Sequence, residues 1–127
     1  MRSRTLIVLS ALFLHSAQVV ACHNVTAEQI LAQFKKAARA EGSQRSETEV
    51  MVVFTIPGDD STTFDYFTKP SHPAHPSNAL TAIYESGGKV WAFSRAFTAG
   101  DCEAFRTLLA SIEAQHEALK ESFRRAK

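Results

Sequence analysis

Four strand-like segments follow one another along the middle of the chain. Residues 50–56, 62–68, 79–85 and 89–97 are rich in β-branched and aromatic side chains or alternate apolar with polar ones. Five turn residues separate the first two segments, and Ser86-Gly87-Gly88 separates the last two. Such short connections join antiparallel strands, so the sequence predicts a four-stranded antiparallel meander. Segment 50–56 has almost no polar side, which is typical of a strand covered on both faces.

Helical patterns precede and follow these strands. Thr26-Ala-Glu-Gln29 is typical of a capping box, and apolar residues follow it at helical spacing as far as Gly42. Asp101 is a predicted N-cap for a second helix that runs to about Arg125. We therefore predict an α+β domain in which an N-terminal and a C-terminal helix flank the meander. The simplest packing places both helices on one face of the sheet, so that aromatic side chains on the other face form a docking surface.

The first 21 residues have the pattern of a secretory signal peptide. Arg2 and Arg4 give a positive start, Thr5–Leu14 is an apolar run, and Val19-Val20-Ala21 precedes the predicted cleavage site. The apolar run is too short for a membrane-spanning helix. We predict that residues 1–21 are removed and that residues 22–127 form one domain, exported to the periplasm or anchored at the outer membrane.

Charge gives no indication of nucleic-acid binding. The whole chain has a net charge of +1, with 14 Lys plus Arg against 13 Asp plus Glu. Removal of residues 1–21 takes away two arginines and no acid, which leaves 12 basic side chains against 13 acidic ones, a net charge of −1. No arginine-rich face with interleaved aromatics is present, so we expect no nucleic-acid partner.

Two cysteines, Cys22 and Cys102, remain after the predicted cleavage. In an oxidising compartment such a pair usually forms a disulfide, which here would tie the new N-terminus to the start of the last helix. The alternative is that Val19-Val20-Ala21-Cys22 acts as a bacterial lipobox, with Cys22 acylated and Cys102 left as a thiol. A lipid on Cys22 would then be the chain's contact with a membrane.

A proline-rich loop, Lys69-Pro-Ser-His72-Pro-Ala-His75-Pro76, joins the second and third strands. Its prolines favour an extended polyproline-like backbone, in which His72 and His75 are one turn apart and point the same way. Two such imidazoles could bind Cu²⁺ or Zn²⁺, but zinc needs a third ligand, for which the candidates are His23, His116, Asp59 and Asp60. The alternatives are a rigid connector whose histidines bond to backbone groups, and a recognition loop.

The segment that enters this loop, Tyr66-Phe67-Thr68-Lys69-Pro70, and the His72-Pro73-Ala74-His75-Pro76 that follows resemble small exported bacterial proteins. The similarity covers about a dozen residues. It implies a recurrent scaffold and carries no activity, catalytic residue or ligand.

The functional hypothesis is a non-catalytic cell-envelope protein that binds another envelope or secreted protein, for example as an inhibitor or immunity-type factor. Rigid aromatics and a pre-ordered loop are good interface anchors. The predicted partner-binding residues are Lys69, Pro70, His72, Pro73, His75 and Trp91. We expect no cofactor. A Cu or Zn protein using His72 and His75 is the alternative. A small hydrolase with one of these histidines as general base ranks third, because the sequence offers no ordered nucleophile and base.

Overall fold

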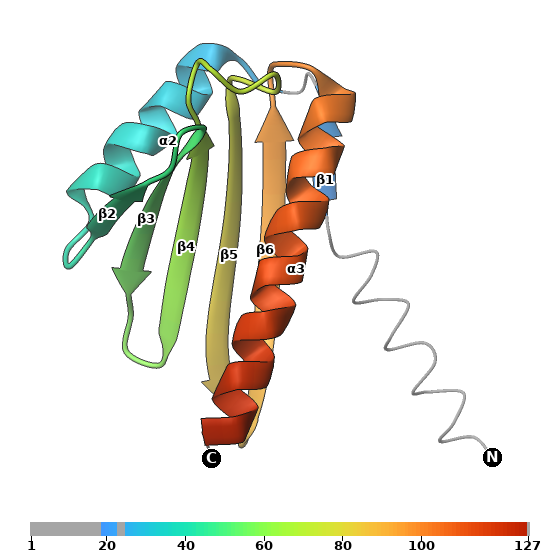
Figure 1. Cartoon of the computed structure of the whole chain (residues 1–127). Coiled ribbons are helices and arrows are strands. Elements are labelled where there is room, and N and C mark those ends of the chain that lie inside the picture. Colours follow the sequence, from blue (N-terminus) through green and yellow to red (C-terminus); the bar gives the residue numbers. More distant parts are fainter. Residues whose placement is uncertain (1–18, 23–24, 127) are drawn as a thin grey trace.

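The computed structural model describes residues 19–22 and 25–126. In chain order the elements are β1 (Val19–Cys22), α2 (Ala27–Arg39), β2 (Gln44–Glu47), β3 (Met51–Pro57), β4 (Ser61–Thr68), β5 (Ser77–Ser86), β6 (Lys89–Thr98) and α3 (Cys102–Ala126). The strands form one sheet in the order β1-β6-β5-β4-β3-β2 (Figure 1). Among the described residues, no helix is both long and apolar enough to span a bilayer.

The predicted α+β class and the antiparallel meander are confirmed. The four predicted strands correspond to β3, β4, β5 and β6, each antiparallel to its neighbour. A fifth strand, β2, extends the meander beyond β3. Its sequence, Gln-Arg-Ser-Glu, is exposed throughout and lies in a segment whose polarity predicts a connector. The Arg45 guanidinium of β2 lies over the rings of Phe34 and Phe54, 5.6 and 5.9 Å from their centroids, so this edge strand covers aromatic side chains of the α2 core cluster with a cation.

The sixth strand, β1, lies parallel to β6 at the other edge of the sheet. Its register runs from Val19 opposite Arg95 to Cys22 opposite Thr98. The predicted signal peptide lies outside the described residues except for residues 19–21, which form most of this strand. Cleavage after Ala21 would therefore remove β1 apart from Cys22.

The two helices lie on opposite faces of the sheet, and the prediction that both cover one face is wrong. Ile30 and Ala37 of α2 pack in one core cluster with Val52, Phe54 and Phe67. Phe105 and Ile112 of α3 pack in the other, with Tyr66, Ala79 and Ala96. The physical reason lies in β3, whose Val52 and Phe54 face α2 while Met51 and Val53 face α3. A strand that is apolar on both sides needs a layer on each, as the sequence of 50–56 predicts.

Both helices begin at the predicted caps. The Thr26 hydroxyl accepts a hydrogen bond from the Gln29 backbone N–H at 3.1 Å, and the Gln29 side chain accepts one from the Thr26 N–H at 2.8 Å. At α3, a carboxylate oxygen of Asp101 accepts a hydrogen bond from the Ala104 N–H at 2.8 Å. These bonds satisfy N–H groups that have no partner within the first helical turn.

Candidate functional site

On the α2 side, one part of the sheet is covered by neither of the helices in the described residues. Tyr84 and Ala82 of β5 lie opposite Trp91 and Phe93 of β6, respectively, and share a face with Leu80. The exposed fractions of the large rings are 38% for Tyr84, 42% for Trp91 and 50% for Phe93. We call these five residues the aromatic face. It is exposed because the α2 core cluster draws its strand residues from β3 and β4, while α3 covers the opposite side (Figure 1).

The aromatic face is held in a fixed conformation by the strands beneath it. Tyr84 and Trp91 are directly paired across the two strands, close to the Gly87-Gly88 turn. Cross-strand aromatic pairs of this kind stabilise a sheet. The Trp91 indole N–H donates a hydrogen bond to the Ser86 carbonyl at 3.2 Å, so its polar atom is satisfied within the hairpin. A partner that covers these rings therefore meets a pre-ordered apolar surface.

The proline-rich loop does not adopt the predicted polyproline conformation. The His72 N–H donates to the Lys69 carbonyl at 2.9 Å, and the His75 N–H donates to the His72 carbonyl at 3.0 Å. These bonds form two successive turns, whereas a polyproline helix has no internal hydrogen bonds. The prolines restrict the backbone, but local hydrogen bonds decide its path.

Each histidine of the loop bonds to a backbone group through Nδ1, His72 within the loop and His75 at the end of β4. His72 Nδ1 accepts a hydrogen bond from the Ala74 N–H at 2.9 Å, so its neutral ring carries the proton on Nε2. His75 Nδ1 lies 2.9 Å from the Thr68 carbonyl, which can only accept, so this ring carries its proton on Nδ1. Nδ1 is therefore an acceptor in His72 and a donor in His75, and the nitrogen that remains in both rings is Nε2. Of the alternatives for this loop, the arrangement fits a rigid connector whose histidines bond to backbone groups.

No group of three or more His, Cys, Asp or Glu side chains is placed to hold a metal ion within residues 19–22 and 25–126. His23, one of the candidates for a third ligand, lies outside the described residues. Among the other predicted binding residues, Lys69 forms an ion pair with Glu47 at 2.8 Å. This pair ties the start of the loop to β2.

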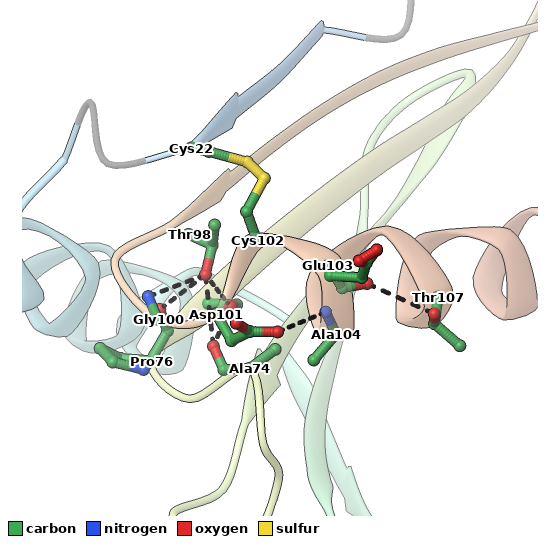
Figure 2. The surroundings of a disulfide bond; sticks show 11 residues. Cys22, Ala74, Pro76, Thr98, Gly100, Asp101, Cys102, Glu103, Ala104 and Thr107 are labelled. Carbon is green, nitrogen blue, oxygen red and sulfur yellow. Dashed lines mark hydrogen bonds between the residues drawn. A yellow bond between two sulfur atoms is a disulfide. The ribbon is translucent and has the colours of Figure 1, made fainter.

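A disulfide fastens the end of β1 to the start of α3, and a set of hydrogen bonds fastens the proline-rich loop to the segment just before α3 (Figure 2). Cys22 and Cys102 form the predicted disulfide, with their Cα atoms 5.6 Å apart, and in this form Cys22 is not the acylated residue of a lipobox. The Thr98 hydroxyl donates to the Ala74 carbonyl at 3.3 Å and accepts from the Gly100 N–H at 2.9 Å. A Cβ on Gly100 would overlap the Ala74 carbonyl, which explains why this position holds glycine.

The loop and the aromatic face lie at opposite ends of the sheet. The loop leads directly into Ser77, which pairs with Thr98 at the end of β6. Trp91 lies seven residues earlier on that strand, roughly 23 Å away at the rise of a β-strand. Among the predicted binding residues, Trp91 therefore belongs to a different surface from Lys69, Pro70, His72, Pro73 and His75.

A buried carboxyl group, that of Asp65 on β4, was not predicted from the sequence as a notable residue. Asp65 is fully buried and accepts hydrogen bonds from Gln33 Nε2 at 3.0 Å and from Asn78 Nδ2 at 2.6 Å. Burial raises the pKa of the Asp65 carboxyl, and the two hydrogen bonds and the charge of Arg95 oppose this rise. The group joins α2 to β4 and β5 on the face that α2 covers.

A second buried polar pair lies on the α3 side. The Tyr66 hydroxyl and His116 Nε2 are 2.9 Å apart, and both side chains are buried. Burial also raises the pKa of the Tyr66 hydroxyl. A cavity of about 150 Å³ adjoins His116 between α3 and the strands β5 and β6, with Thr81, Ser94 and Ile112 in its wall. His116 is thus a core histidine with a partner, as the sequence favours.

The chain matches no protein-family model, and no curated protein or solved structure is significantly similar to it. The residues of the aromatic face are the best candidates for binding another molecule, because their apolar surface is exposed and rigid.

Proposed function

We propose that this protein is a non-catalytic component of the cell envelope that binds another protein through its aromatic face. The observation that carries the proposal is the exposure of Tyr84, Trp91 and Phe93 on neighbouring strands, with neither described helix over them. Tyrosine, tryptophan and phenylalanine are enriched at the centres of protein interfaces. An inhibitor or immunity-type factor is the form of this function that suits a small domain of this kind.

The exposed surface is large enough to drive association. An aromatic side chain carries roughly 150–250 Å² of surface, and the exposed fractions of these three residues are 38% to 50%. Covering them would remove roughly 250 Å² of apolar surface from water, a gain of about 6 kcal/mol at 25 cal/mol per Å². The costs of association reduce this figure, so these rings would act as the centre of a larger contact.

The cell-envelope location is supported by the Cys22–Cys102 disulfide, because such bonds persist in oxidising compartments. The non-catalytic role is supported by the histidines. His72 bonds to the backbone of its own loop, His75 bonds to the backbone at the end of β4, and His116 bonds to Tyr66. A general base needs an oriented partner and a nucleophile within reach. In the described part of the chain these three histidines instead stabilise the loop and the core.

The proposal is tested by affinity capture from an envelope extract of the native host, using three forms of the protein. The first is wild type, the second carries Trp91→Ser and Phe93→Ser, and the third carries Leu31→Ser. Leu31 is the matched control, because it is 52% exposed but lies on α2, away from the aromatic face. We expect wild type and Leu31→Ser to recover the same protein in stoichiometric amount, and the double variant to recover at least tenfold less.

A photo-crosslinking residue at position 93 or at position 31 adds a second readout. We expect the recovered protein to crosslink at position 93 and not at position 31. Equal recovery by the folded double variant, or the absence of any stoichiometric partner, would contradict the proposed function.

A further inference from the structure

The strand β6 has an open edge beside the aromatic face. β6 spans Lys89–Thr98, but β1 pairs only with its last four residues, from Arg95 onward. Within the described residues, the segment Lys89–Ser94 has a strand neighbour on one side only, which is β5. Its remaining backbone groups face outward at the edge of the sheet.

The backbone groups at this edge can be assigned from the hairpin. Gly87 and Gly88 both have positive φ, and Ser86 pairs with Lys89, as in a two-residue type I′ turn. Hydrogen-bonded and non-hydrogen-bonded pairs alternate from that point, so residues 89, 91 and 93 bond to β5. The N–H and C=O groups of Val90, Ala92 and Ser94 are therefore the ones that point to the open edge.

This edge lacks the usual protection against pairing with another chain. Natural edge strands carry charges, prolines or bulges that prevent strand addition. Here Val90-Trp-Ala-Phe-Ser94 holds no charged residue and no proline, and Trp91, Ala92 and Phe93 are all exposed. The charged side chains are at its two ends, Lys89 and Arg95, and both are positive.

We propose that the open edge of β6 binds an extended apolar segment of a partner protein, which adds as a further strand beside Lys89–Ser94. This inference rests on the proposed function and names the chemistry of its partner. The added strand bonds to the backbone of Val90, Ala92 and Ser94, and its side chains on the aromatic-face side cover Trp91 and Phe93. β1 already shows that this edge accepts an extended apolar strand, because Val19-Val20-Ala21 pairs with β6 immediately beyond Arg95.

Charge favours a partner segment with acidic flanks over a second copy of this chain. Antiparallel pairing of two β6 strands along the whole uncharged stretch is centred on Ala92, which places Lys89 of each copy opposite Arg95 of the other. Like charges directly opposite each other destabilise a sheet. A segment with about five uncharged residues between two carboxylates instead places one carboxylate beside Lys89 and brings the other toward the Arg95 side chain, next to the end of β1, where Val19 holds the backbone position opposite Arg95.

The test uses two synthetic peptides, each with the core Val-Thr-Val-Thr-Val, flanked in one by aspartate and in the other by lysine. Binding to the whole protein is measured by isothermal titration, and amide hydrogen exchange of the complex is followed by NMR. We expect the aspartate-flanked peptide to bind at least tenfold more tightly than the lysine-flanked one. We also expect it to slow exchange at Val90, Ala92 and Ser94 while leaving the amides of Trp91 and Phe93, already bonded to β5, unchanged.

The variant Ala92→Pro removes an edge N–H without removing a bond to β5, so it blocks strand addition in a sheet that can still form. We expect it to weaken peptide binding at least tenfold, and Ala92→Lys, which places a charge on the edge, to do the same if the proline variant does not fold. No saturable binding up to about 1 mM peptide, equal binding by the folded variants, or a β6-to-β6 dimer in sedimentation analysis would overturn the inference.

The capture experiment separates this inference from the proposed function. A partner that is lost with Trp91→Ser and Phe93→Ser but retained by Ala92→Pro would bind the aromatic face without adding a strand. That result would leave the proposed function standing and refute strand addition. Loss of the partner in both variants would support both.

Discussion

Removal of the Cys22–Cys102 disulfide should cost this domain a large part of its stability. The bond joins residues 80 positions apart, so it closes almost the whole domain into one loop. The perturbation is the double substitution Cys22→Ser and Cys102→Ser, compared with oxidised wild type. Because the serines nearly match the cysteines in size, the change removes the covalent link with little effect on packing.

The magnitude follows from the length of the closed loop. The chain-entropy relation gives about 4.5 kcal/mol at 25 °C for a loop of this length. The folded double variant recovers some freedom, because β1 is short and loses its tether, so we expect a measured loss of about 3–4.5 kcal/mol. A small domain has roughly 5–15 kcal/mol in total, and the loss corresponds to a fall in melting temperature of about 15–25 °C.

The assay is urea unfolding followed by far-ultraviolet circular dichroism. Fluorescence is a poor probe here, because the single tryptophan, Trp91, is already 42% exposed in the folded state. Wild type reduced with dithiothreitol is the control, and its unfolding curve should coincide with that of the double variant. A loss below about 1 kcal/mol would refute the reasoning, since it would mean that the bond does not restrict the unfolded chain as its loop length requires.

Two further predictions concern buried groups. Burial holds the pKa of the Asp65 carboxyl above its ordinary value, so the contribution of Asp65 to stability is fully present below the ordinary pKa and is lost as pH rises through the folded pKa. Asp65→Asn should therefore flatten the decline in the free energy of unfolding with pH, measured by urea unfolding across the acidic range. An unchanged decline would contradict the raised pKa of Asp65. Gly100→Ala should lower the free energy of unfolding by about 1–3 kcal/mol, because the new Cβ would overlap the Ala74 carbonyl. Gly58→Ala should lower it by less, because the Cβ there would meet the Ser61 hydroxyl, which can move.

The sequence predicts the meander because each of its four strands has a side-chain pattern of its own. Two strands escaped prediction for different reasons. β2 is polar on both sides and is recognised only through its pairing with β3, and β1 lies in a segment that reads as the end of a signal peptide. The placement of the two helices on opposite faces could have been predicted, because a strand without a polar side at 50–56 needs cover on both faces.

For the candidate site too, features set by local sequence could be predicted, and features set by distant residues could not. Alternation along β6 places Trp91 and Phe93 on one face, and the structure leaves that face exposed. The loop histidines could not be placed from their spacing, since the turns depend on bonds that proline content does not determine. Asp65 could not be identified as a buried acceptor, because its donors lie 32 and 13 residues away along the chain.

The position of β1 links the predicted processing of the chain to the proposed binding edge. Cleavage after Ala21 would remove the residues that pair with Arg95, Ala96 and Phe97, while the disulfide would hold Cys22 at Thr98. The open edge of β6 would then lengthen from Lys89–Ser94 to Lys89–Phe97, and the new N-terminus would stay at the far end of it. An exported form would thus offer a partner strand more backbone groups than the unprocessed chain, and the disulfide would keep the chain's own terminus from returning to the edge.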